Sequence, residues 1–234
     1  MSNILALDTA TDACSVSLKR GDKVVSRYRL LPRQHNHLLF SMLREVLGDE
    51  SLASAELDLL TYAQGPGSFT GLRIAASAAQ GLAYTLSIPV AGISSLACLA
   101  QGALRRGVVD DGETVLAMLD ARINEIYWGY YRFSDGLATP LGDDRVGAPA
   151  ELDGSIPDGV DSVVALGSGL ALYDALPATL RSSVERCVED QWPDSIDLLP
   201  LADRARTRGE LVNAAAVQPV YLRNEIHWKK LSEQ

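Results

Sequence analysis

The sequence predicts an α/β protein made of two similar lobes, each with a mixed sheet covered by helices. Apolar runs typical of strands alternate with segments of helical periodicity in the first half of the chain. The same order begins again after a polar, glycine-containing joint at residues 105–112. In each half, an apolar run also leads into a Gly-x-Gly turn, at 65–67 and at 167–169. Two α/β lobes that face one another account for all three observations.

The first lobe opens with a strand, a hairpin and a helix. Residues 4–9 begin with a short apolar run, which is typical of a buried strand. Residues 14–18 and 23–30 flank Arg20-Gly21-Asp22, a hairpin turn signal. The helix is predicted by apolar residues at helical spacing and ends at Gly48; these residues are Leu38, Leu39, Met42, Leu43, Val46 and Leu47.

A glycine turn lies at the centre of this lobe. It follows a predicted buried strand at 57–63 and precedes an alanine-rich helix at 72–86. Three glycines, Gly65, Gly67 and Gly71, fall within seven residues, as expected where the backbone needs positive φ or a close approach. Ser68 and Thr70 both qualify as N-caps of the helix. We expect a strand at 89–93 and a helix from Ser94 or Ser95 to about residue 104 to complete the lobe.

The second lobe is expected to repeat this order. Residues 115–119 form an apolar strand that ends in Asp120, as the first strand ends in Asp8. Residues 125–133 and the segment after Ser134-Asp135-Gly136 predict a second hairpin, and 163–166 predict the strand before the second Gly-x-Gly turn. By analogy, a helix should lie between hairpin and strand, and another after the turn.

These elements predict a division into residues 1–107 and 108–234, with the C-terminal segment able to pack back on the first lobe. Strand, acidic end, hairpin, helix, strand, Gly-x-Gly and helix, repeated twice, is the plan of the actin-like, Hsp70-like and sugar-kinase (ASKHA) ATPases.

Composition limits the functions that are open to the chain. Its 234 residues carry a formal net charge of −9, whereas proteins that grip nucleic acid unaided are usually basic. Residues 201–234 are slightly basic, so any nucleic-acid contact is expected to be auxiliary. No run of 18 apolar residues predicts a membrane span, and the N-terminus lacks the features of a signal peptide. Three separated cysteines indicate reduced thiols and a cytoplasmic location.

The glycine turn does not match the common nucleotide motifs. The pattern G-x-G-x-x-G fails at Thr70, and no acidic residue lies about 20 positions further on, where Val90 and Ala91 stand. A Walker loop needs Gly-Lys-Ser/Thr, and no lysine is near. A tight turn required by packing therefore competes with an anion, nucleotide or partner site.

Four segments together resemble the TsaB (YeaZ) family over residues 4–230. They are I-L-A-L-D-T-A-T-D-A-C-S-V near the start, G-P-G-S-F-T-G-L-R-I-A at the glycine turn, M-L-D-A-R-I-N-E-I-Y after the joint and the late P-V-Y-L-R. The resemblance implies the two-lobed fold and a partner subunit in forming N6-threonylcarbamoyladenosine in tRNA, on the adenosine beside the anticodon. It further implies pairing with TsaD, which carries the transfer chemistry, docking of the ATPase TsaE on that pair, and self-pairing in isolation.

The catalytic features of the fold are altered in this chain. Enzymes of the fold usually end the first strand with Asp-x-Gly-Thr/Ser, whereas here the sequence is Asp8-Thr9-Ala10-Thr11. Asp8 is a weak candidate for a hydrated Mg²⁺, and a structural acid is the alternative. TsaD-like proteins bind metal through two histidines four apart, but His35 and His37 are two apart, and His227 is expected to be structural. We expect no catalytic set, no metal and no tightly bound cofactor, with ATP or ADP only at a complex interface.

Two helices of the first lobe predict a partner surface. The segment 72–86 is apolar on almost every side, which requires either burial within its own lobe or cover by another chain. The helix at 38–47 is similarly broad in its apolar surface. Because the related family pairs through this lobe, we expect the interface to include Leu38, Phe40, Met42, Arg73, Ile74, Ser77, Ala78 and Gly81.

The sequence therefore predicts a non-catalytic subunit that activates a tRNA-modifying transferase, with TsaD and TsaE as partners and tRNA contacted indirectly. An ATP-dependent small-molecule kinase or phosphotransferase of the same fold is the first alternative. A peptidase is the second, although no nucleophile or metal set supports it.

Overall fold

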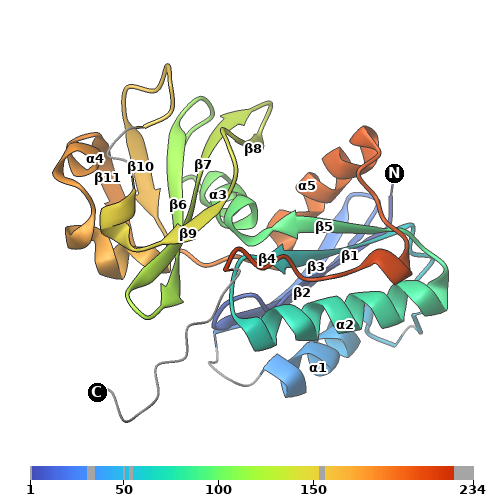
Figure 1. Ribbon diagram of the computed structural model, residues 1–234. Helices are drawn as coiled ribbons and strands as arrows, with labels where there is room; N and C mark the ends of the chain where they lie inside the picture. The colour runs from blue at the N-terminus through green and yellow to red at the C-terminus, as the bar shows by residue number, and fades with distance from the viewer. Residues whose placement is uncertain (1, 31–34, 50, 53–54, 153–155, 224–234) are drawn as a thin grey trace, which may run out of the picture.

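The computed structural model describes residues 2–30, 35–49, 51–52, 55–152 and 156–223. Two sheets stand side by side, each with its own layer of helices (Figure 1). Among the described residues, no helix has the length and apolarity needed to cross a bilayer.

The first sheet has the order β3-β2-β1-β4-β5. Its central strand β1 pairs antiparallel with β2 and parallel with β4. The hairpin predicted around Arg20-Gly21-Asp22 is confirmed as β2 and β3. The bounds are β1 Ile4–Asp8, β2 Ala13–Arg20, β3 Lys23–Leu30, β4 Leu59–Gly65 and β5 Val90–Ser94.

The second sheet repeats the first. Its order is β11-β10-β6-β7-β8, so a central strand again lies between an antiparallel hairpin and two parallel strands. A further short strand, β9 (Arg145–Gly147), pairs with β7. The predicted duplication of the α/β layout is thereby confirmed. The bounds are β6 Thr114–Arg122, β7 Glu125–Ser134, β8 Leu137–Pro140, β10 Val163–Leu166 and β11 Val184–Val188.

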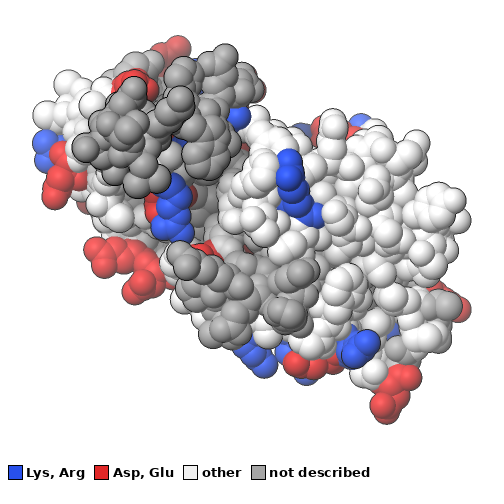
Figure 2. Space-filling model, turned by 60° about the horizontal axis from the view of Figure 1, so that its bottom comes forward, with Lys and Arg blue, Asp and Glu red and all other residues white. Residues whose placement is uncertain are grey.

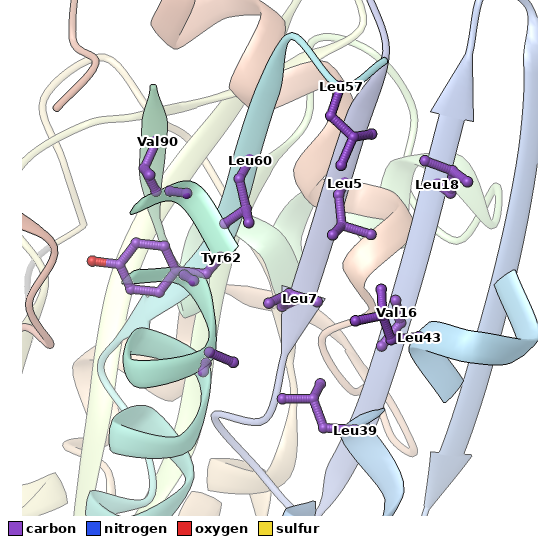
Figure 3. Packing of buried hydrophobic residues seen from close by; sticks show 14 of the residues in the cluster. Leu5, Leu7, Val16, Leu18, Leu39, Leu43, Leu57, Leu60, Tyr62 and Val90 are labelled. Atoms are coloured by element: carbon purple, nitrogen blue, oxygen red, sulfur yellow. The ribbon is translucent and has the colours of Figure 1, made fainter. Parts of the chain in front are cut away.

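Helices cover both faces of the first sheet. The helices α1 (His35–Leu47) and α2 (Phe69–Leu86) lie on one face, and α5 (Ser195–Arg208) lies on the other (Figure 1). Side chains of a strand alternate between faces, so β1 serves both layers. Its Leu5 and Leu7 pack in the cluster with α1 and α2 (Figure 3), whereas Ile4 and Ala6 pack with α5.

The lobes exchange helices across the predicted division at residue 107. The helix α3 (Ser95–Arg105) precedes that point, yet it packs mainly against the second sheet. Conversely, α5 follows it and covers the first sheet. The two helices meet through an ion pair, in which Arg105 Nε lies 2.6 Å from Oδ1 of the buried Asp197. The two lobes are therefore joined by the contact between α3 and α5.

Of the two helices expected in the second half, the one after the Gly-x-Gly turn is short and the one between hairpin and strand was a wrong prediction. After the Gly-x-Gly turn there is an irregular 3₁₀ stretch, Ser168–Ala175, and then the short α4 (Ala178–Ser182). Between β9 and β10 the described residues contain only a single 3₁₀ turn, Pro149–Glu151. Proline and glycine recur through both segments, and neither residue supports a continuous helix.

Candidate functional site

A cleft opens where the two lobes face one another. Its volume is about 1150 Å³, and it lies at the carboxyl ends of β1 and β6, where open α/β sheets usually bind ligands. Its walls come from the β1–β2 turn, the glycine turn, the β6–β7 turn, Ser168 and the C-terminal segment 220–223.

The glycines of the turn allow the chain to pack against its own backbone. A Cβ atom on Gly67 would strike the carbonyl oxygen of Ala10, and one on Gly71 would strike that of Thr9. Hydrogen bonds fix the same contact, because Ser68 N–H donates to the Ala10 carbonyl at 2.7 Å and Thr9 Oγ1 donates to the Gly71 carbonyl at 2.7 Å. The tight-turn interpretation of Gly67 and Gly71 is therefore supported.

The remaining glycine of the turn faces the C-terminal segment. Gly65 has φ +128°, and a Cβ there would meet the carbonyl oxygen of Val220. Val220 N–H donates to the Gln64 carbonyl at 2.7 Å, so the segment is held at the carboxyl end of β4. Sequence reasoning noticed P-V-Y-L-R as a family segment but did not place it here.

The start of α2 differs slightly from the prediction. The helix begins at Phe69 instead of residue 72, and Ser68 is its N-cap, accepting a hydrogen bond from Gly71 N–H at 3.3 Å. Thr70, the other candidate, lies within the first turn.

Asp8 is buried at the end of β1. Its Oδ1 accepts the Ala10 N–H at 2.8 Å, and Oδ2 has no hydrogen-bond partner among the described residues. Burial raises the pKa of Asp8 from 3.8 to about 7; the Ala10 N–H opposes this, and the carboxylates of Asp194 and Asp197 add to it. The side chain is therefore enclosed in protein, and its charged form is less favourable than that of an exposed aspartate.

These residues do not fit a magnesium triphosphate. Asp8 is fully buried. A glycine at position 10 would let a phosphate come close to the backbone, but the residue there is Ala10, which packs against Gly67. On the opposite wall, Arg122 lies 2.9 Å from Asp120 and 3.7 Å from Asp12, so it joins the two hairpin turns across the cleft. The end of β1 therefore lacks the open approach that a glycine would give a phosphate.

We predict that Asp8→Asn makes stability less dependent on pH. Because folding raises the pKa of Asp8, the free energy of unfolding falls as the pH rises from about 4 to 7. In this range the unfolded chain has already released the proton that the folded chain still holds. Asparagine mimics the protonated acid but leaves an unpartnered amide, which costs about 1–3 kcal/mol. The variant should match the wild type near pH 5 and exceed it by about 2 kcal/mol at pH 8, measured by urea unfolding. A difference that stays constant between these pH values would contradict the prediction.

Cysteines and histidines suggest no other chemistry. Cys14 and Cys98 are buried, and burial raises the pKa of the Cys14 thiol to about 12. In the part of the chain that the structure describes, no three His, Cys, Asp or Glu side chains gather as metal ligands would. The side chains of His35 and His37, and all of His227, lie outside the described residues.

The outer face of α1 and α2 carries most of the predicted partner residues. Phe40 is 50% exposed, and Arg73, Ser77 and Gly81 point outward from α2. Leu38 and Ile74 are half-buried at the margin of the core.

Two of the predicted partner residues were placed on the wrong side. Met42 is 1% exposed and Ala78 is 8% exposed, and both belong to the core cluster beneath the helices. Met42 shares the helical spacing of Leu39, Leu43 and Val46 and lies with them in the core. The helix α2 is apolar on several sides, so spacing alone did not reveal that Ala78 meets the sheet. Tyr84 was missed although it is 80% exposed; it continues the outward row of Ser77 and Gly81.

The α2 part of this face is largely uncharged. Figure 2 shows a broad area without acidic or basic side chains over the first lobe. Within α2, Arg73 is the one charged residue, and the other outward side chains are small, polar or aromatic. An uncharged helical face with projecting aromatic rings is suited to contact with another protein.

The duplicated sheets and the cleft between them define a two-lobed α/β protein of the actin, Hsp70 and sugar-kinase group. A family model described as "TsaD: tRNA N6-adenosine threonylcarbamoyltransferase" matches residues 29–180. The chain is 37% identical over 232 residues to "tRNA threonylcarbamoyladenosine biosynthesis protein TsaB" of Escherichia coli, covering 97% of each chain. It is 32% identical over 238 residues to the protein of that name in Haemophilus influenzae, covering 97% of this chain and 96% of the relative.

A solved structure agrees with these relatives. "YeaZ from Pseudomonas aeruginosa" superposes with a TM-score of 0.86 at 37% identity, covering 95% of this chain and all of that one. The chain belongs to the TsaB (YeaZ) family.

Proposed function

We propose that this chain acts in the formation of N6-threonylcarbamoyladenosine in tRNA as a non-catalytic activating subunit. The full-length similarity to proteins named for threonylcarbamoyladenosine biosynthesis supports the pathway. In this proposal TsaD carries the transfer chemistry, the present chain pairs with it through α1 and α2, and TsaE docks on the pair. Two copies of the chain use the same face when TsaD is missing.

One observation supports the non-catalytic role: the chain's own groups occupy two positions beside the carboxyl ends of β1 and β6. Ala10 packs against Gly67, and Arg122 pairs with Asp12 and Asp120. A kinase of this fold would need those positions open to a nucleotide, so the phosphotransferase alternative loses support. In this proposal, this chain contacts ATP or ADP only at a surface that it shares with a partner.

In this proposal, the chain activates TsaD by changing the populations of its conformations. A subunit that binds one conformation of TsaD more tightly than another raises the share of the tighter-binding conformation. The uncharged outer face of α2 is the part of this chain that would supply that binding free energy.

Reconstitution tests the proposal directly. Purified TsaD, unmodified tRNA and threonylcarbamoyl-adenylate are mixed with and without this chain, and the modified nucleoside is measured by mass spectrometry. We expect product formation to depend on the chain, and expect the chain alone to give no product and no ATP hydrolysis. Equal product without it would refute the activating role, and ATP turnover by the pure chain would favour a kinase-like enzyme.

A further inference from the structure

The C-terminal segment 217–223, here called the strap, crosses the mouth of the cleft. It follows the first lobe closely: Val217 is buried in the core beneath α2, and Tyr62 Oη donates to the Gln218 carbonyl at 2.8 Å. Val220 then pairs with Gln64 beside the glycine turn. Figure 1 shows this segment running from the α2 side of the first lobe toward the second.

Tyr221 fixes the strap to the start of α2. Its hydroxyl accepts a hydrogen bond from Arg73 Nε at 3.0 Å, and its ring centroid lies 5.4 Å from that of Phe69. The Arg73 guanidinium lies 3.7 Å above the Phe69 ring, a cation–π contact. All three side chains remain exposed, so they extend the outer face of α2 to the mouth of the cleft.

Arg223 fixes the strap to the second lobe. Its Nη2 donates to the Ala121 carbonyl at 3.2 Å and forms an ion pair with Glu125, the first residue of β7. The side chains of Tyr221 and Arg223, only two positions apart, therefore hold different lobes. The other described ion pair across the cleft, between Arg122 and Asp12, is longer at 3.7 Å and involves a well-exposed guanidinium.

We propose that the strap is a latch that couples the partner surface of α2 to closure of the cleft. A partner that covers Phe69, Arg73 and Tyr221 excludes water from these side chains. This strengthens the hydrogen bond and ring contacts that hold the strap to the first lobe. The Arg223 end is thereby held against Glu125 and the lobes stay together. Because such coupling is reciprocal, release of Arg223 weakens partner binding although Arg223 lies inside the cleft. This inference rests on the proposed pairing with TsaD.

Distance measurements between the lobes test the latch without TsaD, with the labelled chain diluted in unlabelled chain so that a self-paired copy carries no second pair of labels. One nitroxide label is placed on the exposed Cys187 of β11 and a second on Asp22→Cys in the β2–β3 turn, while buried Cys14 and Cys98 stay unlabelled. Double electron–electron resonance then reports the separation of the lobes. We expect Arg223→Gln to lengthen and broaden the distance distribution relative to the wild type.

Binding to TsaD, measured by calorimetry, tests the coupling. We expect Arg223→Gln to weaken binding about 5- to 10-fold, at the lower end of ordinary coupling between sites. Glu125→Gln should act in the same way, and the double variant should add little because both changes break one contact. The matched control is Arg206→Gln, which breaks an exposed ion pair with Asp203 within α5; it should change neither quantity.

The outcomes separate the latch from the function on which it rests. An unchanged distance distribution in both Arg223→Gln and Glu125→Gln overturns the latch. Wider lobes with unchanged binding overturn the coupling. Failure of the wild type to bind TsaD overturns the proposed pairing and, with it, the coupling, while the distance measurement still decides whether the strap holds the lobes.

Discussion

Replacing Gly71 by alanine is expected to destabilise the protein by about 3 kcal/mol or more. The added Cβ would strike the Thr9 carbonyl oxygen, with the Thr9 carbonyl carbon 3.1 Å away. Both atoms belong to the backbone, and Thr9 is also tied to Gly71 by its own hydroxyl. Neither side can withdraw unless α2 leaves the β1–β2 turn, so the cost should exceed that of ordinary overpacking.

The same helix provides the control. A Cβ on Gly81 meets nothing within 4 Å, and alanine there should stabilise the helix by about 0.5–1 kcal/mol. Urea and thermal unfolding measure both variants; at about 2–4 °C per kcal/mol, Gly71→Ala should lower the melting temperature by roughly 10 °C. If the two variants were equally stable, the glycine turn would not be packed against the β1–β2 turn.

The layout of the fold could be predicted because the central strands β1, β4 and β10 are buried on both faces and the turns have strong signals. Runs such as 57–63 and the Arg20-Gly21-Asp22 hairpin need no long-range information. The choice between Ser68 and Thr70 as the N-cap, in contrast, required long-range information. Both residue types suit the position, and the contact of Thr9 with Gly71 settles where α2 begins.

The site was harder to predict because its contacts join distant parts of the sequence. Arg73 meets Tyr221 across 148 positions, and no periodicity indicates such a contact. The error at Ala78 has a different cause. In a helix with small apolar residues on several sides, the hydrophobic pattern has no sharp direction, so the buried side was not determined.

Replacing Ser77 by glutamate is expected to abolish pairing with TsaD while leaving the subunit folded. Ser77 points outward in the middle of the uncharged face, so the new carboxylate is hydrated in the free protein and stability should change by less than about 0.5 kcal/mol. In the complex it would be buried without a partner, which costs about 3–5 kcal/mol, or roughly 150- to 5,000-fold in affinity. Formation of the modified nucleoside should fall together with the affinity for TsaD.

Two further variants decide whether the α2 face itself is responsible. Ser182→Glu adds the same charge to an exposed position of the second lobe and should leave both pairing and product unchanged. Ala78→Glu, one position from Ser77, should instead unfold the protein, because it places the carboxylate in the core beneath α2. If Ser77→Glu binds TsaD as the wild type does by calorimetry, pairing must use another surface. The uncharged face would then require a different partner, since one charge at its centre would have cost the complex nothing.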